Sequence, residues 1–180
     1  GYTNKIRITK YAIFKHEGSK VKTKKFQIPL YKLKEEFKNT EFYKKYTKQD
    51  VLANIYETKG KEFGRVVPLA YLTREGLEEA LMEGTILVNF TDGDKKFFNV
   101  DKNNGIAYIK GLNPRKQKRY WYFRESAEIN GYGKEFENRV KIEPNVTFAG
   151  DVFNIGLGRI VAYEYNIGKI KYLKLGIIGD

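Results

Sequence analysis

Few residue types in this chain could carry acid–base or covalent chemistry. It contains no cysteine, one histidine (His16) and two serines (Ser19 and Ser126). Cysteine nucleophiles are therefore excluded, a Ser-His-Asp triad would have to use His16, and the ligands of a zinc site are missing. Glycine-rich phosphate-binding motifs are also missing. Any catalysis must rest on Asp, Glu, Tyr or Lys, which suits glycosidic-bond cleavage by carboxylates.

Asp151 is the carboxylate best placed for such a role. It follows "VTFAG" and precedes "VFNIGLG", so apolar residues flank it on both sides. A carboxyl group in apolar surroundings is expected to be partly buried, which raises its pKa and suits it to act as a general acid. The alternative is an Asp that accepts hydrogen bonds from backbone N–H groups of a loop. The sequence leaves both interpretations open.

A strip of cations and aromatic residues, "NPRKQKRYWYFRE", occupies positions 113–125. In a strand, its side chains would alternate between two faces, and Trp121 and Phe123 would contribute to the core. The opposite face, with the cations at the beginning of the strand, supplies the predicted binding residues: Lys118, Arg119, Tyr120, Tyr122 and Arg124. Such a face can stack on sugar rings or on nucleobases, or it can form the rim of a barrel without binding anything.

The charge of the chain is strongly positive and unevenly distributed. The net charge is +12, of which residues 1–50 contribute +9 and residues 51–180 contribute +3. Lysine outnumbers arginine 26 to 8. This composition fits a diffuse attraction to a polyanion better than base-specific recognition, for which the arginine fork is typical. Single-stranded nucleic acid, an anionic membrane surface and an acidic cell-wall polymer remain possible partners, as does a lysine-rich surface that only water solvates.

The first 68 residues are predicted to begin with a very basic hairpin. The segments "KIRITKYAIF" (5–14) and "VKTKKFQI" (21–28) are typical of strands, and "HEGSK" (16–20) between them is typical of a turn.

Several short helices should follow the hairpin. Pro29 can open a helical region, since the next apolar residues recur at helical spacing. Thr47 and Asp50 have the spacing of a capping box. The clearest helix of the chain should begin after Thr73, a good N-cap, and end at Gly84.

The residues after Gly84 are predicted to be β-structure. The turn Asp92-Gly93 joins two alternating segments as in a hairpin. Further segments typical of strands follow between Gly and Asn residues: "RYWYFRE", "RVKI", "VTFAG", "RIVAYEY" and "KIKYLKLGII". The pattern indicates a mainly β (α+β) fold, either a closed β-barrel or a sandwich. We expect a single domain over 1–180, with the hairpin and helices in 1–68 and a helix followed by the barrel core in 69–180.

Parts of the sequence resemble the membrane-bound lytic murein transglycosylase A family. The matching segments are "GRVVPLAYLTREGLEEAL" (64–81), "KKFFNVDKNNGIAYIKGL" (95–112), the opening "GYT" and "GDVFNIGLG" (150–158), where Asp151 and Gly158 keep the family's spacing. The resemblance implies a double-psi β-barrel. Two further aspartates of the family's barrel, and the glycine-rich run after its catalytic Asp, have no counterpart here.

The resemblance also implies a function. Asp151 would protonate the glycosidic oxygen as a general acid and then act as a base, while the muramyl C6 hydroxyl attacks C1 to give an anhydro product. Neither a metal nor a cofactor would be needed for this reaction. The chain would then be a peptidoglycan-directed protein at the cell wall that cleaves or binds glycan strands. The alternatives are a non-catalytic module that binds a polyanion and a structural or inhibitory protein. The start at Gly1 rather than Met is a hint of a removed signal peptide and favours an extracytoplasmic location, and a cytoplasmic location stays open. No stretch approaches the eighteen apolar residues of a membrane helix.

Overall fold

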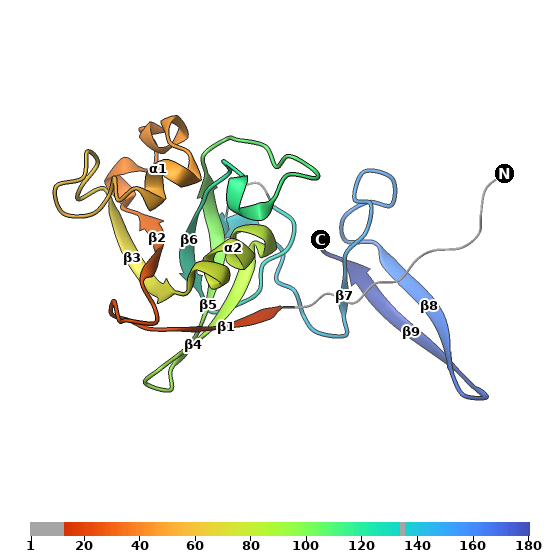
Figure 1. The fold of residues 1–180 in the computed structure, drawn as a ribbon. Helices are drawn as coiled ribbons and strands as arrows, with labels where there is room; N and C mark the ends of the chain where they lie inside the picture. The colour runs from red at the N-terminus through yellow and green to blue at the C-terminus, as the bar shows by residue number, and fades with distance from the viewer. Residues whose placement is uncertain (1–12, 134–135) are drawn as a thin grey trace.

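The computed structural model describes residues 13–133 and 136–180, and most of their regular structure is β (Figure 1). This confirms the prediction of a mainly β fold. The strands are β1 (Phe14–Gly18), β2 (Ile28–Leu33), β3 (Val66–Leu72), β4 (Thr85–Phe90), β5 (Lys95–Asn103), β6 (Trp121–Ser126), β7 (Thr147–Phe148), β8 (Ile160–Ile167) and β9 (Ile170–Ile178). The helices are α1 (Lys48–Leu52), α2 (Arg74–Glu83) and four short 3-10 turns, η1 (Glu35–Phe37), η2 (Phe42–Lys45), η3 (Pro114–Lys116) and η4 (Phe136–Asn138).

The central sheet has four strands in the order β1-β4-β5-β6. β4 and β5 form an antiparallel hairpin, as predicted, and Gly93 in its turn adopts a φ of 95°, which favours glycine. β6 pairs with β5 in antiparallel fashion, with a register shift between Val100 and Lys102. β1 lies at the other edge and runs parallel to β4.

The predicted N-terminal hairpin is wrong in the part that the structure describes. Most of its first segment, 5–14, lies outside the described residues. The expected turn at 16–20 instead belongs largely to β1, which continues to Gly18 and pairs with β4. Ser19 then forms an isolated bridge with Tyr71 of β3, so the chain turns from the central sheet towards the β2–β3 pair.

The prediction that Pro29 opens a helix is also wrong, because Pro29 lies in β2, which pairs with β3. A register shift between Leu30 and Tyr31 interrupts this strand. Leu30, Tyr31 and Leu33 are all buried as a result, and this spacing resembles that of a helix face. The missing N–H of Pro29 is tolerated because, among residues 13–133 and 136–180, β2 pairs with β3 alone and so has an open edge.

Local capping signals fix both α-helices as predicted. The Thr47 side chain accepts from the backbone N–H of Asp50, and the Asp50 carboxylate accepts from that of Thr47, which completes the capping box of α1. The Thr73 side chain caps α2 by accepting from the backbone N–H of Gly76. Gly84 ends α2 with a φ of 78°. α2 packs on β1, β2, β3 and β4, where Leu77 and Leu81 enter the core.

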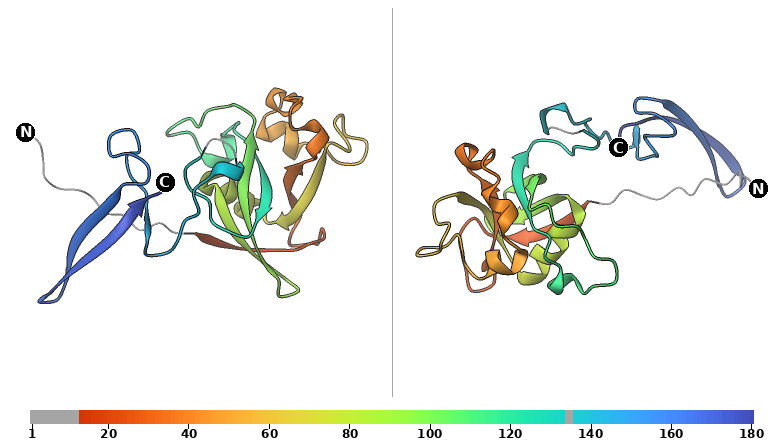
Figure 2. Two further views of the ribbon diagram at one scale, coloured as in Figure 1. Left: turned by 180° about the vertical axis from the view of Figure 1, so that it is seen from behind. Right: turned by 90° about the horizontal axis from the view of Figure 1, so that it is seen from above.

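The C-terminal strands form a separate three-stranded sheet in the order β7-β9-β8. Figures 1 and 2 show this sheet beside the body formed by β1–β6 and the helices, and most residues of β8 are exposed. Residues 139–142, predicted as a strand, contribute only the isolated bridge between Asn130 and Lys141. No sheet of residues 13–133 and 136–180 closes on itself, so the closed barrel is not confirmed.

The hydrophobic core lies within the body. Side chains of β2–β6, α1, α2 and the 3-10 turn η2 form one cluster, and its largest fully buried members include Tyr120, Tyr122, Phe98 and Phe123. Among the described residues, none of the helices is long and apolar enough to cross a membrane.

Candidate functional site

Tyr120 and Tyr122 are fully buried, so the prediction that they form an exposed stacking face is wrong. Phe123, on the opposite side of β6, is equally buried. Both faces of the strand are therefore covered. The Tyr122 ring makes edge contacts with Tyr120, at 5.1 Å between centroids, and with Tyr43, at 5.4 Å. These contacts assign the two tyrosines to the core rather than to an open glycan-binding surface.

The buried tyrosine hydroxyls differ in their hydrogen bonding. Tyr56 and Tyr122 share a hydrogen bond, with 2.6 Å between their hydroxyl oxygens. Burial raises the pKa of both, so they stay neutral at physiological pH. The hydroxyl of Tyr120 is also buried but has no hydrogen-bond partner among the described residues. Leaving such a group unpaired costs about 1–3 kcal/mol, so its position calls for an explanation.

The predicted cations hold parts of the fold together. Arg119 donates from Nη2 to the backbone oxygen of Leu81, 2.6 Å away, and its guanidinium lies 4.0 Å from the ring centroid of Trp121. Arg124 donates to Glu137, with 2.9 Å between Nη1 and Oε1. Lys118 is exposed, and its backbone oxygen accepts from the backbone N–H of Lys48 at 2.9 Å. The structure does not gather the five predicted binding residues on one face, and their role in glycan binding remains a prediction.

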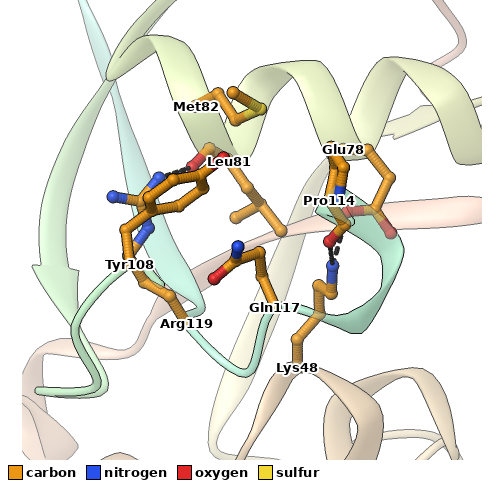
Figure 3. A pocket seen from close by; sticks show the side chains of 8 residues that line it. All are labelled: Lys48, Glu78, Leu81, Met82, Tyr108, Pro114, Gln117 and Arg119. Atoms are coloured by element: carbon orange, nitrogen blue, oxygen red, sulfur yellow. Dashed lines mark hydrogen bonds and ion pairs between the residues drawn. The ribbon is translucent and has the colours of Figure 1, made fainter. Parts of the chain in front are cut away.

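Figure 3 shows a pocket beside the strip, between α2 and the segment that leads into β6. Its volume of about 10 Å³ has room for roughly one water molecule. Lys48 donates to Glu78 and to the backbone oxygen of Pro114, 2.6 Å away. Gln117 donates to the backbone oxygens of Ile109 and Leu112. These polar groups already have partners within the fold, which indicates a structural role.

Asp151 is exposed, so the expectation of a partly buried carboxyl group with a raised pKa is wrong. Its Oδ1 accepts from the backbone N–H groups of Phe153 and Asn154, both at 3.1 Å, and its Oδ2 accepts from Asn154 Nδ2 at 2.6 Å. The hydrogen bond from the Asn154 side chain is the main cause that lowers the pKa of Asp151. The apolar neighbours do not bury it, since the Phe153 side chain is 90% exposed. Asp151 therefore has the geometry of the loop-capping alternative.

A larger hollow lies between β2, α1 and Tyr120. Its volume is about 200 Å³. The lining residues are Lys22, Gln27, Ile28, Pro29, Tyr31, Val51, Leu52, Asn54 and Tyr120. The sequence does not predict this hollow, because segments far apart in the chain form it and the segment after Pro29 has the pattern of a helix. The only sequence signal was the aromatic strip, and Tyr120 comes from that strip.

Within the described part of the chain, one group of side chains has ligand atoms close enough to hold a metal ion. His16, Glu79 and Glu83 have ligand atoms within 4.8 Å of one another. His16 Nε2 lies 3.0 Å from Glu83, and Nδ1 lies 3.5 Å from Glu79. Because the two carboxylates lie at different ring nitrogens, the arrangement also satisfies a buried imidazole without a metal. Burial raises the pKa of Glu83.

Comparison with solved structures shows which fold the elements form. The chain superposes on Escherichia coli MltA with bound chitohexaose with a TM-score of 0.67, over 96% of this chain, at 15% identity. The chain has the MltA fold. The membrane-bound lytic murein transglycosylase of Agrobacterium tumefaciens matches with a TM-score of 0.64 over 93% of this chain at 13% identity, and MltA of Neisseria gonorrhoeae with 0.63 over 92% at 9%. The MltA-like resemblance of the sequence is thereby confirmed at the level of the fold.

The chain spans only part of the length of these three structures, and its sequence identity to each of them is low. The chain covers 59%, 61% and 60% of these three structures, in the order given above. No protein-family model matches the sequence. No curated protein matches it either.

Proposed function

We propose that the chain is a peptidoglycan-directed domain that binds glycan strands at the cell wall, outside the cytoplasm. The observation that carries the proposal is the MltA-like fold, which extends over 96% of the chain in the comparison with chitohexaose-bound MltA. Chitohexaose is a chain of linked N-acetylglucosamine units. The Escherichia coli protein therefore binds the sugar backbone of a glycan. The positive charge of +12 supports the proposal, because it favours contact with an anionic wall polymer.

Glycan binding should be separable from non-specific attraction to polyanions by its salt dependence. We expect the protein to sediment with purified sacculi and to bind chitohexaose, with affinities for the neutral sugar that change little between low and physiological salt. Binding driven by phosphates would weaken steeply with salt, because it depends on the release of counterions. The measurement is a salt titration against sacculi, chitohexaose and single-stranded DNA. Absence of binding to both glycans, or binding to DNA alone, would contradict the proposal and favour the polyanion module.

Catalysis by Asp151 is a separate hypothesis with its own test. We expect Asp151→Asn to leave the binding of chitohexaose unchanged, because the substitution keeps an acceptor oxygen on an exposed turn. Incubation with sacculi then compares the release of anhydromuropeptides by the native protein and the variant. Release that disappears in the variant would support Asp151 as the acid. Equal release by both proteins, or none by the native protein, would reject that role and leave the binding function standing.

A further inference from the structure

His16, Glu79 and Glu83 meet where the edge strand β1 packs against α2 (Figure 1). Glu79 and Glu83 are four positions apart, so they lie one turn apart on the same face of the helix. His16 is a buried residue of β1, and its side chain is only 4% exposed. One ring nitrogen and one oxygen of each carboxylate lie within 4.8 Å of one another. Two regular elements therefore hold an imidazole and two carboxylates together.

The hydrogen bond between His16 and Glu83 determines which ring nitrogen carries the proton. Nε2 lies 3.0 Å from a carboxylate oxygen of Glu83, and a carboxylate can only accept a hydrogen bond. Nε2 therefore carries the N–H group, and in the neutral imidazole Nδ1 keeps a free lone pair. An imidazole that binds a metal commonly donates its other N–H to a carboxylate in this way, which fixes the ring and makes the ligating nitrogen more basic.

The Nδ1 atom of His16 lacks a hydrogen bond in the part of the chain that the structure describes, because the ring bonds there only through Nε2. Nδ1 instead faces a carboxylate oxygen of Glu79, 3.5 Å away, which is another acceptor. Two acceptors that face each other beside so buried a ring need a proton or a cation between them. Protonation of Nδ1 would supply the first, and a bound metal ion would supply the second.

The surroundings of Nδ1 suit a cation. Gly76 lies beside it, and a β-carbon at that position would be 3.8 Å from Nδ1, so the missing side chain leaves room. The Glu79 side chain is 62% exposed, which opens this side of the cluster to solvent. Within residues 13–133 and 136–180, no Lys or Arg nitrogen lies within 4 Å of the Glu79 or Glu83 carboxylate, although the chain has 34 Lys and Arg residues. The negative charge of the cluster is therefore left for an ion to neutralise.

We propose that His16 and Glu79 bind a divalent transition-metal ion such as Zn²⁺, and that Glu83 orients the imidazole. The ligands would be Nδ1, a Glu79 oxygen and water. The 3.5 Å between the two protein atoms is close to the roughly 3.3 Å expected between ligands of a tetrahedral ion with bonds of about 2.0–2.1 Å. Such a site needs only one imidazole, unlike the sites rich in His or Cys that the composition excludes. The ion would join β1 to α2, and this role is independent of glycan binding.

Titration of Zn²⁺ into the full chain tests the inference sharply, because His16 is the only histidine. The ¹⁵N signals of an imidazole therefore report on this residue alone. We expect one saturable site by calorimetry, and at saturation the ring should keep its proton on Nε2 while the Nδ1 signal shifts. Mg²⁺ should leave the ring signals unchanged, because it prefers oxygen ligands. Zn²⁺ should also raise the Tm, since an ion that binds only the folded state stabilises it.

Two variants and a control identify the ligands. Glu79→Gln changes an exposed side chain, so the variant should fold, and it should bind Zn²⁺ at least about tenfold more weakly. His16→Gln should abolish the site, with circular dichroism as the check that this variant folds. The matched control is Glu75→Gln, because Glu75 is similarly exposed on the same helix but pairs with Arg115. The control should bind Zn²⁺ as the native chain does.

Several results would overturn the inference. They are the absence of saturable Zn²⁺ binding, equal affinities of Glu79→Gln and the native chain, and coordination through Nε2 in place of Nδ1. A ring that carries protons on both nitrogens, and keeps them when Zn²⁺ is added, would show that the imidazolium alone satisfies the two carboxylates. Binding to sacculi is measured separately, so failure of this metal site and failure of the proposed function are distinguishable.

Discussion

Replacing Glu78 by Ala should lower the free energy of unfolding by about 3 kcal/mol, since removing one partner of a buried ion pair leaves the other charge uncompensated. The side chains of Lys48 and Glu78 are only 1% and 10% exposed. In the variant, the Lys48 ammonium would keep the backbone oxygen of Pro114 as its acceptor but lose its carboxylate. Arg74, the second partner of Glu78, is nearer the surface and can be solvated. Urea denaturation of both proteins at neutral pH measures the difference.

The loss of unfolding free energy caused by Glu78→Ala should become smaller as the pH rises towards 10. Burial lowers the pKa of Lys48 even in the native protein, and loss of Glu78 lowers it further. The unfolded chain then binds more protons than the folded one, so stability increases with pH through this range. Replacing both partners, in Lys48→Met/Glu78→Leu, should recover most of the loss.

Glu75→Ala is the matched control for Glu78→Ala. Glu75 lies on the same helix and pairs with Arg115, but both side chains are more than half exposed. It should therefore change stability little, because exposed ion pairs contribute little. Equal stabilities of Glu75→Ala and Glu78→Ala would contradict a structural role for the buried pair.

Phe98→Ala should cost about 3–5 kcal/mol of unfolding free energy, as expected when a large core side chain is removed. Phe98 is 1% exposed and lies in β5, the strand that pairs with both β4 and β6. Its ring also makes an edge contact with Phe90, at 6.3 Å between centroids. A cavity at this position would weaken both strand pairs, and calorimetry or urea denaturation would detect the loss.

Phe153→Ala is the matched control, because it removes the same type of side chain from the surface instead of the core. Phe153 is 90% exposed in the loop between β7 and β8, so its removal creates no cavity. We expect Phe153→Ala to change the free energy of unfolding little. The difference in stability between the two variants should therefore be most of the loss expected for Phe98→Ala. A Phe153→Ala variant as unstable as Phe98→Ala would show that the C-terminal loop is buried in solution.

Elements that short-range chemistry defines could be predicted from the sequence. The caps at Thr47 and Thr73, the end of α2 at Gly84 and the hairpin turn at Asp92-Gly93 each depend on residues within a few positions of one another. The resemblance to MltA rested on similarly local segments, and the superposition confirms it for the fold. Local signals of this kind can be recognised in the sequence without knowledge of the tertiary structure.

Features that depend on distant partners could not be predicted. The register shift in β2 breaks the alternation of buried residues, so the segment after Pro29 had the pattern of a helix. An alternating pattern shows that the segment 120–126 has two faces, but not that both are covered, so the sequence alone places Tyr120 and Tyr122 at the surface, whereas both are buried. Asp151 was expected to be buried because its neighbours are apolar, yet neighbours in sequence do not bury a loop unless another element packs on it. The hollow was missed for the same reason.

The parallel pairing of β1 and β4 has a consequence for how the protein folds. Phe14 lies opposite Ile86, so this pairing joins residues 72 positions apart. Such long-range pairing folds slowly, because the entropy lost in closing the intervening loop precedes the gain from contact. During synthesis, β1 leaves the ribosome well before β4 exists, and its backbone N–H and C=O groups stay available to other chains in that interval. Slow refolding with concentration-dependent aggregation is the expected kinetic signature.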